Sequence, residues 1–337
     1  MIKEGINELV SGRQLSQEQA EQIFDEIMSG EADDIQKSAF LTALAIKGET
    51  IEETTALANI MRKYCEKPNH ECEVLEIVGT GGDKSDSFNI STTSSFVLSA
   101  TGINVAKHGN RAASSKCGAA DVLEALGAKL DISPEKSSKI LDELGICFLF
   151  AQKYHSAMKH VGGIRKELGF KTIFNLAGPL SNPAFPEYQL LGVYREDLLE
   201  PMAKVLNNLG VKRGMVVYGR DCLDEISLSS DTAICEFKGD RMRKYVIRPE
   251  QYGFRRCKKS ELTGGTPEEN AGITRKILSG EEKGAKRDAV VLNSMFAYHI
   301  VHPEVDLHVS RKIVESAIDS GKASEKLESF IKATQEE

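Results

Sequence analysis

VLEIVGTGGDKSDSFNIST, residues 74–92, marks the point at which the chain changes character. A short apolar run ends there in a glycine-rich loop, and a helix start follows. Similar apolar runs predict further strands, each followed by a loop or helix, at about 103–107, 146–149, 190–193 and 215–218. Strands that alternate with helices are typical of a mostly parallel sheet flanked by helices. We therefore predict an α/β domain over residues 73–337.

The chain before this stretch has the periodicity of helices. Apolar residues recur every three or four positions at about 16–29, 34–46 and 51–64, and Ser16 and Thr50 stand where N-caps are expected. These segments predict a small helical domain over residues 1–68, with the boundary near 66–73.

The second half of the chain carries fewer clear signals. Ser133 followed by Pro134 predicts a sharp helix start. Alternating residues around Tyr245 to Ile247 indicate an edge hairpin within the polar stretch 238–262. Helices are expected at about 267–279, 285–300 and 307–335.

Composition limits the classes of function. The 337 residues are 41% hydrophobic, and the net charge of -7 comes from acids and bases mixed along the chain. Without a basic block, nucleic acid is a poor default partner. The start lacks a signal pattern and no apolar run reaches membrane-span length, so we expect no membrane contact and a cytoplasmic location. Seven scattered cysteines favour reduced thiols, and the histidines form no zinc pattern.

The glycine loop at residues 79–83 has the character of an anion-binding loop. Glycines let the backbone approach a ligand closely, and the free amides of the following helix start favour phosphate. Asn89, Ser91 and Thr92 add polar side chains. The loop lacks both the Gly-Lys-Ser/Thr of a P-loop and the dinucleotide glycine spacing. The alternative is an ordinary glycine turn with Ser91 as N-cap.

A second polar loop, KHGNRAASSK, occupies residues 107–116 after the next predicted strand. It combines fixed cations, among them Lys107 and Arg111, with several hydroxyls. Because ligands in open α/β sheets sit at the carboxyl ends of strands, we expect this loop to face the glycine loop. A solvated basic turn is the alternative.

Two further signals are weaker when taken alone. Asp224 and Glu225 follow a strand, and adjacent loop carboxylates can hold Mg²⁺ together with substrate phosphates, although most such pairs are solvated. The guanidinium of Arg165 could bind a substrate carboxylate through two hydrogen bonds, or it could pair with Glu167 on the surface.

Together these segments resemble the anthranilate phosphoribosyltransferase family of tryptophan synthesis. The resemblance covers nearly the whole chain, and its most specific parts are GTGGD at 79–83, NIST at 89–92, KHGNR at 107–111, ADVLEALG at 120–127, FNLAGPL at 174–180 and LDE at 223–225. It implies transfer of the 5-phosphoribosyl group from 5-phosphoribosyl-1-pyrophosphate (PRPP) to the amino group of anthranilate, with Mg²⁺, two ions per monomer, and release of pyrophosphate. It also implies a homodimer whose helical domain takes in roughly residues 155–185, with the active site in the cleft between the domains.

The resemblance also implies roles for individual residues. Contacts to PRPP are expected from Gly79, Gly82, Asp83, Ser87, Asn89, Ile90, Ser91, Thr92, Lys107, His108, Gly109, Asn110, Arg111, Ala112, Ala113, Ser114, Ser115 and Ala119. Contacts to anthranilate or its entry path are expected from Gly79, His108, Asn110, His155, Arg165 and Pro179. Ser91, Asp224 and Glu225 are expected to hold Mg²⁺. Lys107 and Asp83 would act electrostatically, with no dedicated acid or base.

The chain departs from the family pattern at two positions. Ala119 stands where the family has serine, so a hydroxyl at the donor site is lost, and Ser156 replaces a proline near the acceptor path. Two other functions fit the architecture. A pyrimidine nucleoside phosphorylase is disfavoured by Arg165 and by the Asp224–Glu225 pair, and a non-catalytic nucleic-acid-binding paralogue is disfavoured by the acidic charge.

Overall fold

The computed structural model describes residues 1–112 and 115–336, and its first part is helical. The helices are α1 (Ile2–Val10), α2 (Gln17–Ser29), α3 (Asp34–Lys47) and α4 (Ile51–Lys63). Ser16 and Thr50 are confirmed as N-caps. Each accepts a hydrogen bond from the amide three residues later, and the side chain at that position accepts from the cap's own amide. These capping boxes explain why α2 and α4 begin where the sequence indicates.

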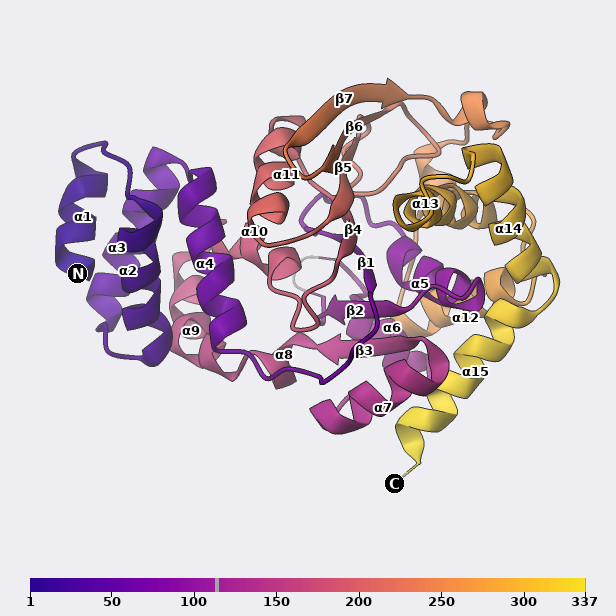
Figure 1. Ribbon diagram of the computed structural model, residues 1–337, viewed down its shortest axis with the longest axis horizontal. Helices are drawn as coiled ribbons and strands as arrows, with labels where there is room; N and C mark the ends of the chain where they lie inside the picture. Colours follow the sequence, from indigo (N-terminus) through magenta and orange to yellow (C-terminus); the bar gives the residue numbers. More distant parts are fainter. Residues whose placement is uncertain (113–114, 337) are drawn as a thin grey trace.

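A seven-stranded sheet forms the centre of the molecule (Figure 1). Its strands are β1 (Leu75–Gly79), β2 (Val105–Gly109), β3 (Ile146–Phe150), β4 (Tyr188–Gly192), β5 (Arg213–Gly219), β6 (Thr232–Lys238) and β7 (Arg241–Ile247). The order is β3-β2-β1-β4-β5-β6-β7, parallel from β3 to β5 and antiparallel beyond. The predicted mostly parallel sheet and edge hairpin are confirmed. The hairpin begins at Thr232, earlier than expected, because β6 is mostly buried and lacks a clear alternation.

Helices cover both faces of this sheet. The helices that follow β1 in the chain are α5 (Ile90–Ala100), α6 (Ala119–Leu126), α7 (Pro134–Leu144), α8 (Ala151–Tyr154), α9 (Lys159–Leu168), α10 (Phe174–Ala177), α11 (Leu199–Asn208), α12 (Pro267–Leu278), α13 (Ala285–Val301), α14 (Leu307–Asp319) and α15 (Lys322–Gln335). In Figure 1, α5 and α12–α15 lie on one side of the sheet and α11 lies on the other. None of the helices in the described part of the chain is long and apolar enough to cross a membrane.

Two details of the helix prediction can be compared with the structure. The start at Ser133 is confirmed, since its hydroxyl accepts from the Lys136 amide at 3.2 Å. The single helix expected at 307–335 is wrong, because the chain turns between α14 and α15. Gly321 adopts a left-handed φ of 82° there, which a continuous helix excludes.

Part of the chain after β3 packs against the N-terminal helices. Val161, Ile173 and Phe174 share a hydrophobic core with α2 and α3, and the Phe174 ring lies 6.5 Å from that of Phe24 in an edge-to-face arrangement. Figure 1 shows α9 beside the N-terminal helices. Residues 1–65 and this later stretch therefore share one apolar core, separate from the core around the sheet.

Buried polar groups lie where the helices meet the sheet. Arg62 of α4 donates through Nε to the Leu180 carbonyl at 2.9 Å, and Glu76 of β1 accepts from the His108 amide at 3.2 Å. One carboxylate oxygen of Glu76 has no hydrogen-bond partner in the described part of the chain. Burial raises the pKa of Glu76 to about 8, although the charge of Lys107 opposes the rise. Ionised Glu76 therefore costs stability at high pH.

Replacement of Glu76 by glutamine should make stability less dependent on pH. The folded-state pKa lies above the unfolded one, so the stability that the protonated group contributes is present at low pH and is lost as the pH rises through about 8. Glu76→Gln has no proton to lose. We expect its melting temperature to exceed that of the wild type at about pH 9 and to differ much less at about pH 5. An equal difference at both pH values would contradict this assignment.

Candidate functional site

The glycine loop between β1 and α5 packs against Asp224, which follows β5 at the same edge of the sheet. The Gly81 amide donates to Asp224 Oδ2 at 2.7 Å, and a Cβ at Gly79 would collide with the same carboxylate. Gly81 and Gly82 have φ of 69° and 72°, in the left-handed region that favours glycine. The loop is thus more than a surface turn, because Gly79 must lack a side chain beside a buried acid.

The alternative role of Ser91 as an N-cap is wrong. Helix α5 is preceded by Asn89, which makes no side-chain capping bond, and Ser91 lies inside the first turn. The Ser91 amide donates to Glu225 Oε1 at 3.2 Å. The free amides at the start of α5 therefore face an acid of the site, as expected for a helix N-terminus that attracts negative charge.

Asp224 and Glu225 form a buried acidic pair, each with 8% of its surface exposed. Burial raises the pKa of Asp224 well above its usual range and that of Glu225 to about 7, and the charge of Asp83 contributes to both. The Asp224 amide donates to Asp83 Oδ2 at 3.3 Å. The solvated-pair alternative is therefore wrong, and the three acids concentrate negative charge at one point.

Lys107 is the cation nearest to these acids. It is buried in the middle of β2, and its ammonium donates to the Ile77 carbonyl at 2.8 Å and to Ser91 Oγ at 3.3 Å. Burial lowers its pKa, while Glu225 and other acids oppose the change. One ammonium group cannot balance all of these carboxylates, so ionising them leaves excess negative charge.

This excess charge fits a divalent cation that arrives with a phosphorylated ligand. Among residues 1–112 and 115–336, no three His, Cys, Asp or Glu side chains are arranged to hold a metal by themselves. Asp224 and Glu225 supply two carboxylates, and Ser91 adds a hydroxyl close by. Mg²⁺ is commonly held by one or two carboxylates, with substrate phosphates and water completing its shell.

The loop after β2 is stabilised by acids of α6. Asp121 Oδ2 accepts from the amides of Ala112 and Gly118, both at 2.8 Å. The Arg111 guanidinium pairs with Glu124, at 2.8 Å between Nη2 and Oε1, so of Lys107 and Arg111 only Lys107 faces the buried acids. Ser115 lies beside Cys117, while the expected contacts at Ala113 and Ser114 fall outside the described residues.

Asn89 connects the two loops. Its Nδ2 donates to the Cys117 carbonyl at 3.2 Å, and its Oδ1 accepts from Asn270 of α12 at 2.9 Å. Ile90 points into the main core, so only its backbone can contact a ligand. No motif marked Asn270 in the sequence, because its partner lies far away in the chain.

The remaining expected donor contacts lie around these loops. Ser87 pairs with Thr263 in an isolated bridge, and Thr92 is buried in the first turn of α5. Gly109 ends β2 and Asn110 follows it, where its side chain accepts from Gln152 at 3.3 Å. Ala119 begins α6.

Among the residues expected at the acceptor side, Arg165 lies on α9. The Arg165 guanidinium lies over the Phe174 ring, 5.3 Å from its centre. Burial alone lowers its pKa, and within the described residues it forms no ion pair with Glu167. A half-buried guanidinium without a bound acid is suited to a carboxylate ligand.

Two of the residues expected along the entry path of anthranilate, His108 and His155, are buried next to each other. The rings of His108 and His155 lie 5.0 Å apart at 60°. Burial lowers the pKa of His108 well below its usual range and that of His155 to about 4. Both are neutral at physiological pH. Pro179 is buried, and its carbonyl accepts from Gln189 at 2.8 Å.

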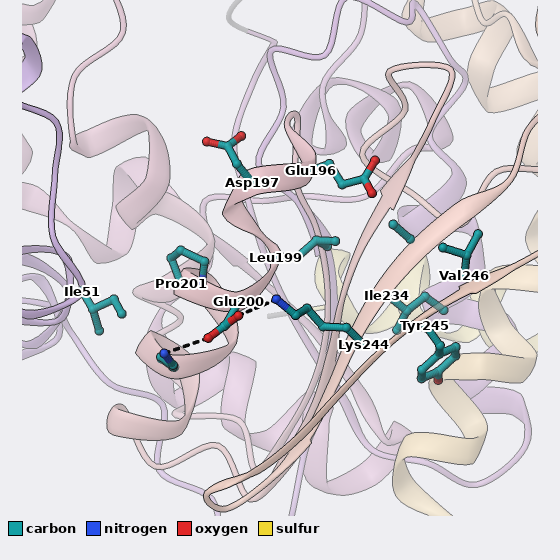
Figure 2. A pocket seen from close by; sticks show the side chains of 12 residues that line it. Ile51, Glu196, Asp197, Leu199, Glu200, Pro201, Ile234, Lys244, Tyr245 and Val246 are labelled. Atoms are coloured by element: carbon teal, nitrogen blue, oxygen red, sulfur yellow. Dashed lines mark hydrogen bonds and ion pairs between the residues drawn. The ribbon is translucent and has the colours of Figure 1, made fainter.

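A hollow of about 570 Å³ lies away from these residues, between α11 and the β6–β7 hairpin. Figure 2 shows Lys244 of the hairpin reaching toward Glu200 of α11. Glu200 pairs with Lys244 at 2.6 Å and with Lys204 at 2.9 Å. These two lysines balance the charge of Glu200. The hollow therefore shows no excess of negative charge like that at the carboxyl ends of the strands.

Sequence analysis also missed Lys171, which follows α9. Its ammonium donates to the Gly82 carbonyl at 3.1 Å and lies 3.5 Å from the centre of the Tyr194 ring. The residue directly precedes the stretch that contains FNLAGPL, but a lone lysine has no spacing that reveals such a contact.

Comparisons with known proteins agree with this arrangement. Residues 3–65 match a family model described as the helical bundle domain of a glycosyl transferase family, and residues 71–324 match the a/b domain of that family. Anthranilate phosphoribosyltransferases from Lachnoclostridium phytofermentans and Methanobrevibacter smithii are 57% and 56% identical, over 98% and 99% of both chains respectively.

Solved structures agree as well. Anthranilate phosphoribosyltransferase from Thermus thermophilus has a TM-score of 0.93 at 39% identity, covering 98% of this chain and 99% of its own. The Saccharomyces cerevisiae enzyme in complex with PRPP and Mg has a TM-score of 0.92 at 27% identity, covering 99% and 97%. The buried acids, the two polar loops and this likeness along the whole chain have one explanation: the chain belongs to the anthranilate phosphoribosyltransferase family.

Proposed function

We propose that this protein transfers the 5-phosphoribosyl group of PRPP to the amino group of anthranilate, releasing pyrophosphate, in tryptophan synthesis. The observation that carries the proposal is the meeting of Asp224, Glu225, Ser91 and Lys107 at the carboxyl ends of the strands. Such a group suits a Mg²⁺-bound diphosphate. Family membership narrows the donor to PRPP and the acceptor to anthranilate.

The hard step is cleavage of the bond between the anomeric carbon and pyrophosphate. Positive charge develops on the ribose and negative charge on the leaving group. The Lys107 ammonium, the amides of the glycine loop and the start of α5 are fixed donors that stabilise the negative charge without rearranging. Asp83, on the same loop, acts electrostatically on the donor side. Mg²⁺ held by Ser91, Asp224 and Glu225, two ions per monomer in our proposal, would neutralise the pyrophosphate further.

The acceptor needs positioning more than activation. Anthranilate has an aromatic amine that is neutral at physiological pH, so no strong base is required before attack. The depressed pKa values of His108 and His155 make both imidazoles weak proton acceptors. We propose that they line the entry path with Pro179, that Arg165 binds the carboxylate, and that Gly79 and Asn110 complete the acceptor site.

The shared core of the helices supports a division into two domains. We propose that residues 1–68 and roughly 155–185 form one domain and that 73–337 form the other, with substrates bound between them. Exposed apolar side chains on α3 support a homodimer, because Ile35 and Ile46 are each 83% exposed. All seven cysteines are free thiols, which supports a reducing, cytoplasmic setting.

The proposed reaction can be followed by the fluorescence of anthranilate. We expect the signal to fall when purified protein, PRPP and MgCl₂ are combined, and to persist when EDTA is added first. A metal-dependent fall would establish donor, acceptor and cation together. A constant signal with folded protein would refute the acceptor or the donor.

Arg165→Ala should weaken binding of anthranilate. Loss of a two-pronged, charge-assisted contact raises the anthranilate KM by about tenfold or more, with a much smaller change in the KM for PRPP. Glu167→Gln is the matched control, since it tests the surface ion pair instead. An unchanged anthranilate KM in Arg165→Ala would exclude the carboxylate role.

Asp224→Asn combined with Glu225→Gln should weaken Mg²⁺ binding. Removing both carboxylates takes away the protein's charged ligands, so the MgCl₂ concentration for half-maximal turnover should rise by more than about tenfold. Turnover measured across a MgCl₂ titration checks this. Asp240→Asn, which removes an exposed carboxylate from the β6–β7 turn, should leave the titration unchanged. Unaltered metal dependence of the double variant would remove the metal assignment.

Ile35→Glu should separate the dimer. A charge in an apolar contact between subunits is left without a partner, so sedimentation velocity should detect a monomer where the wild type is a dimer. Val309→Glu on α14 is the control, because Val309 is also exposed but lies on a different helix. A wild-type protein that sediments as a monomer would refute the dimer.

A further inference from the structure

Lys171 lies over the glycine loop, although its own segment packs with the N-terminal helices. Its ammonium donates to the Gly82 carbonyl at 3.1 Å, and a Cβ at Gly82 would come within 3.0 Å of it. The ammonium also lies over the Tyr194 ring, 3.5 Å from its centre. A cation that bonds a carbonyl and faces an aromatic ring has a defined position, in contrast to most surface lysines.

The glycine loop beneath Lys171 has a backbone conformation that neighbouring groups must stabilise. Gly81 and Gly82 are left-handed, and so are Lys84 and Asp86, with φ of 57° and 51°. For residues with a side chain this conformation is costly, and it persists only where neighbouring structure enforces it. Hydrogen bonds within the loop, such as the one from the Ser85 amide to Asp83 Oδ1 at 3.1 Å, provide part of this stabilisation.

Arg165 and Lys171 are carried by the same short segment. Helix α9 ends at Leu168, and the left-handed φ of 69° at Gly169 turns the chain out of the helix. Phe174 then packs against Phe24 and lies beneath the Arg165 guanidinium. A displacement of α9 therefore moves Lys171 as well, and with it the contact to Gly82.

We propose that Lys171 is a positioning residue that couples the two substrate sites. Through the Gly82 carbonyl it holds the glycine loop in the conformation that receives the phosphorylated donor. Its position depends on the segment that carries Arg165. A carboxylate bound at Arg165 restrains that segment, which strengthens the hold on the loop and so tightens donor binding. This inference rests on the proposed function for the identity of the two ligands.

Hydrogen–deuterium exchange of the free protein tests the first half of the proposal without any substrate. We expect Lys171→Met to speed amide exchange in peptides covering 81–87 and to leave the rest of the sheet unchanged. Lys171→Arg should resemble the wild type, because a guanidinium can donate to the carbonyl and stack on Tyr194. Lys159→Met is the charge-matched control on α9. Tyr194→Leu, which removes the ring, should act in the same direction as Lys171→Met.

Calorimetry tests the coupling itself. The Kd of PRPP with MgCl₂ is measured with and without benzoate, which has the carboxylate for Arg165 but no amine to react. In the wild type we expect benzoate to tighten PRPP binding by about fivefold or more, and PRPP to tighten benzoate by the same factor, because coupling is reciprocal. In Lys171→Met this factor should fall toward one, and in Lys171→Arg it should be retained.

The outcomes separate the inference from the function on which it rests. A wild type that turns over substrates, with equal coupling in Lys171→Met, overturns the role of Lys171 alone. Unchanged loop exchange in Lys171→Met also overturns it. If the wild type binds neither PRPP nor benzoate, the proposed function fails, and the exchange comparison still decides whether Lys171 holds the loop.

Discussion

The burial of Asp224 against the glycine loop is the contact around which the site is built. A carboxylate enclosed by protein is costly to ionise, so it must be matched by donors or by a cation. Here the Gly81 amide provides one donor, and the absence of a side chain at Gly79 provides the space. At Gly192, the end of β4, any Cβ would collide with the Asp224 backbone. Glycine is therefore required on two neighbouring strands so that the acid can lie between them.

The remaining charges follow from this placement. Glu225 lies against the amides at the start of α5, and Lys107 reaches Ser91 from β2, but one ammonium cannot balance the neighbouring acids. A bound cation and its polyphosphate are therefore needed to balance the charges of the site. A site of this kind is organised in advance for a charged ligand, since the fixed groups need not rearrange when the ligand's charge develops.

The acceptor side has the opposite character. Of the residues proposed for it, Arg165 and His155 come from the segment that packs with the N-terminal helices, whereas His108 stands on β2. His108 and His155 are neutral because they are buried. Arg165 supplies a charge that pairs with no acid among residues 1–112 and 115–336. The two halves of the site therefore belong to two hydrophobic cores. Contacts such as those of Lys171 and Arg62 pass between these cores, so the geometry of one half depends on the other.

Sequence alone was sufficient for the parts of the protein that local chemistry determines. Capping boxes mark helix starts at Ser16 and Thr50, apolar runs mark the parallel strands, and glycines mark the loop after β1, because each signal acts within a few residues. Prediction from local sequence failed where residues far away in the chain determine the structure. Strand β6 is buried and shows no alternation, and Ser91 looks like a cap until Glu225 is placed beside it.

The roles of the charged residues depended on the tertiary structure. Whether Asp224 and Glu225 are solvated or buried is decided by contacts with residues more than a hundred positions away in the chain. Whether Arg111 or Lys107 faces them depends on Glu124, which pairs with Arg111. The sequence determined which groups are available and at which strand ends they stand. Only the folded chain decided which of them lose water and acquire partners, because desolvation and charge pairing depend on distance in space and not on separation along the chain.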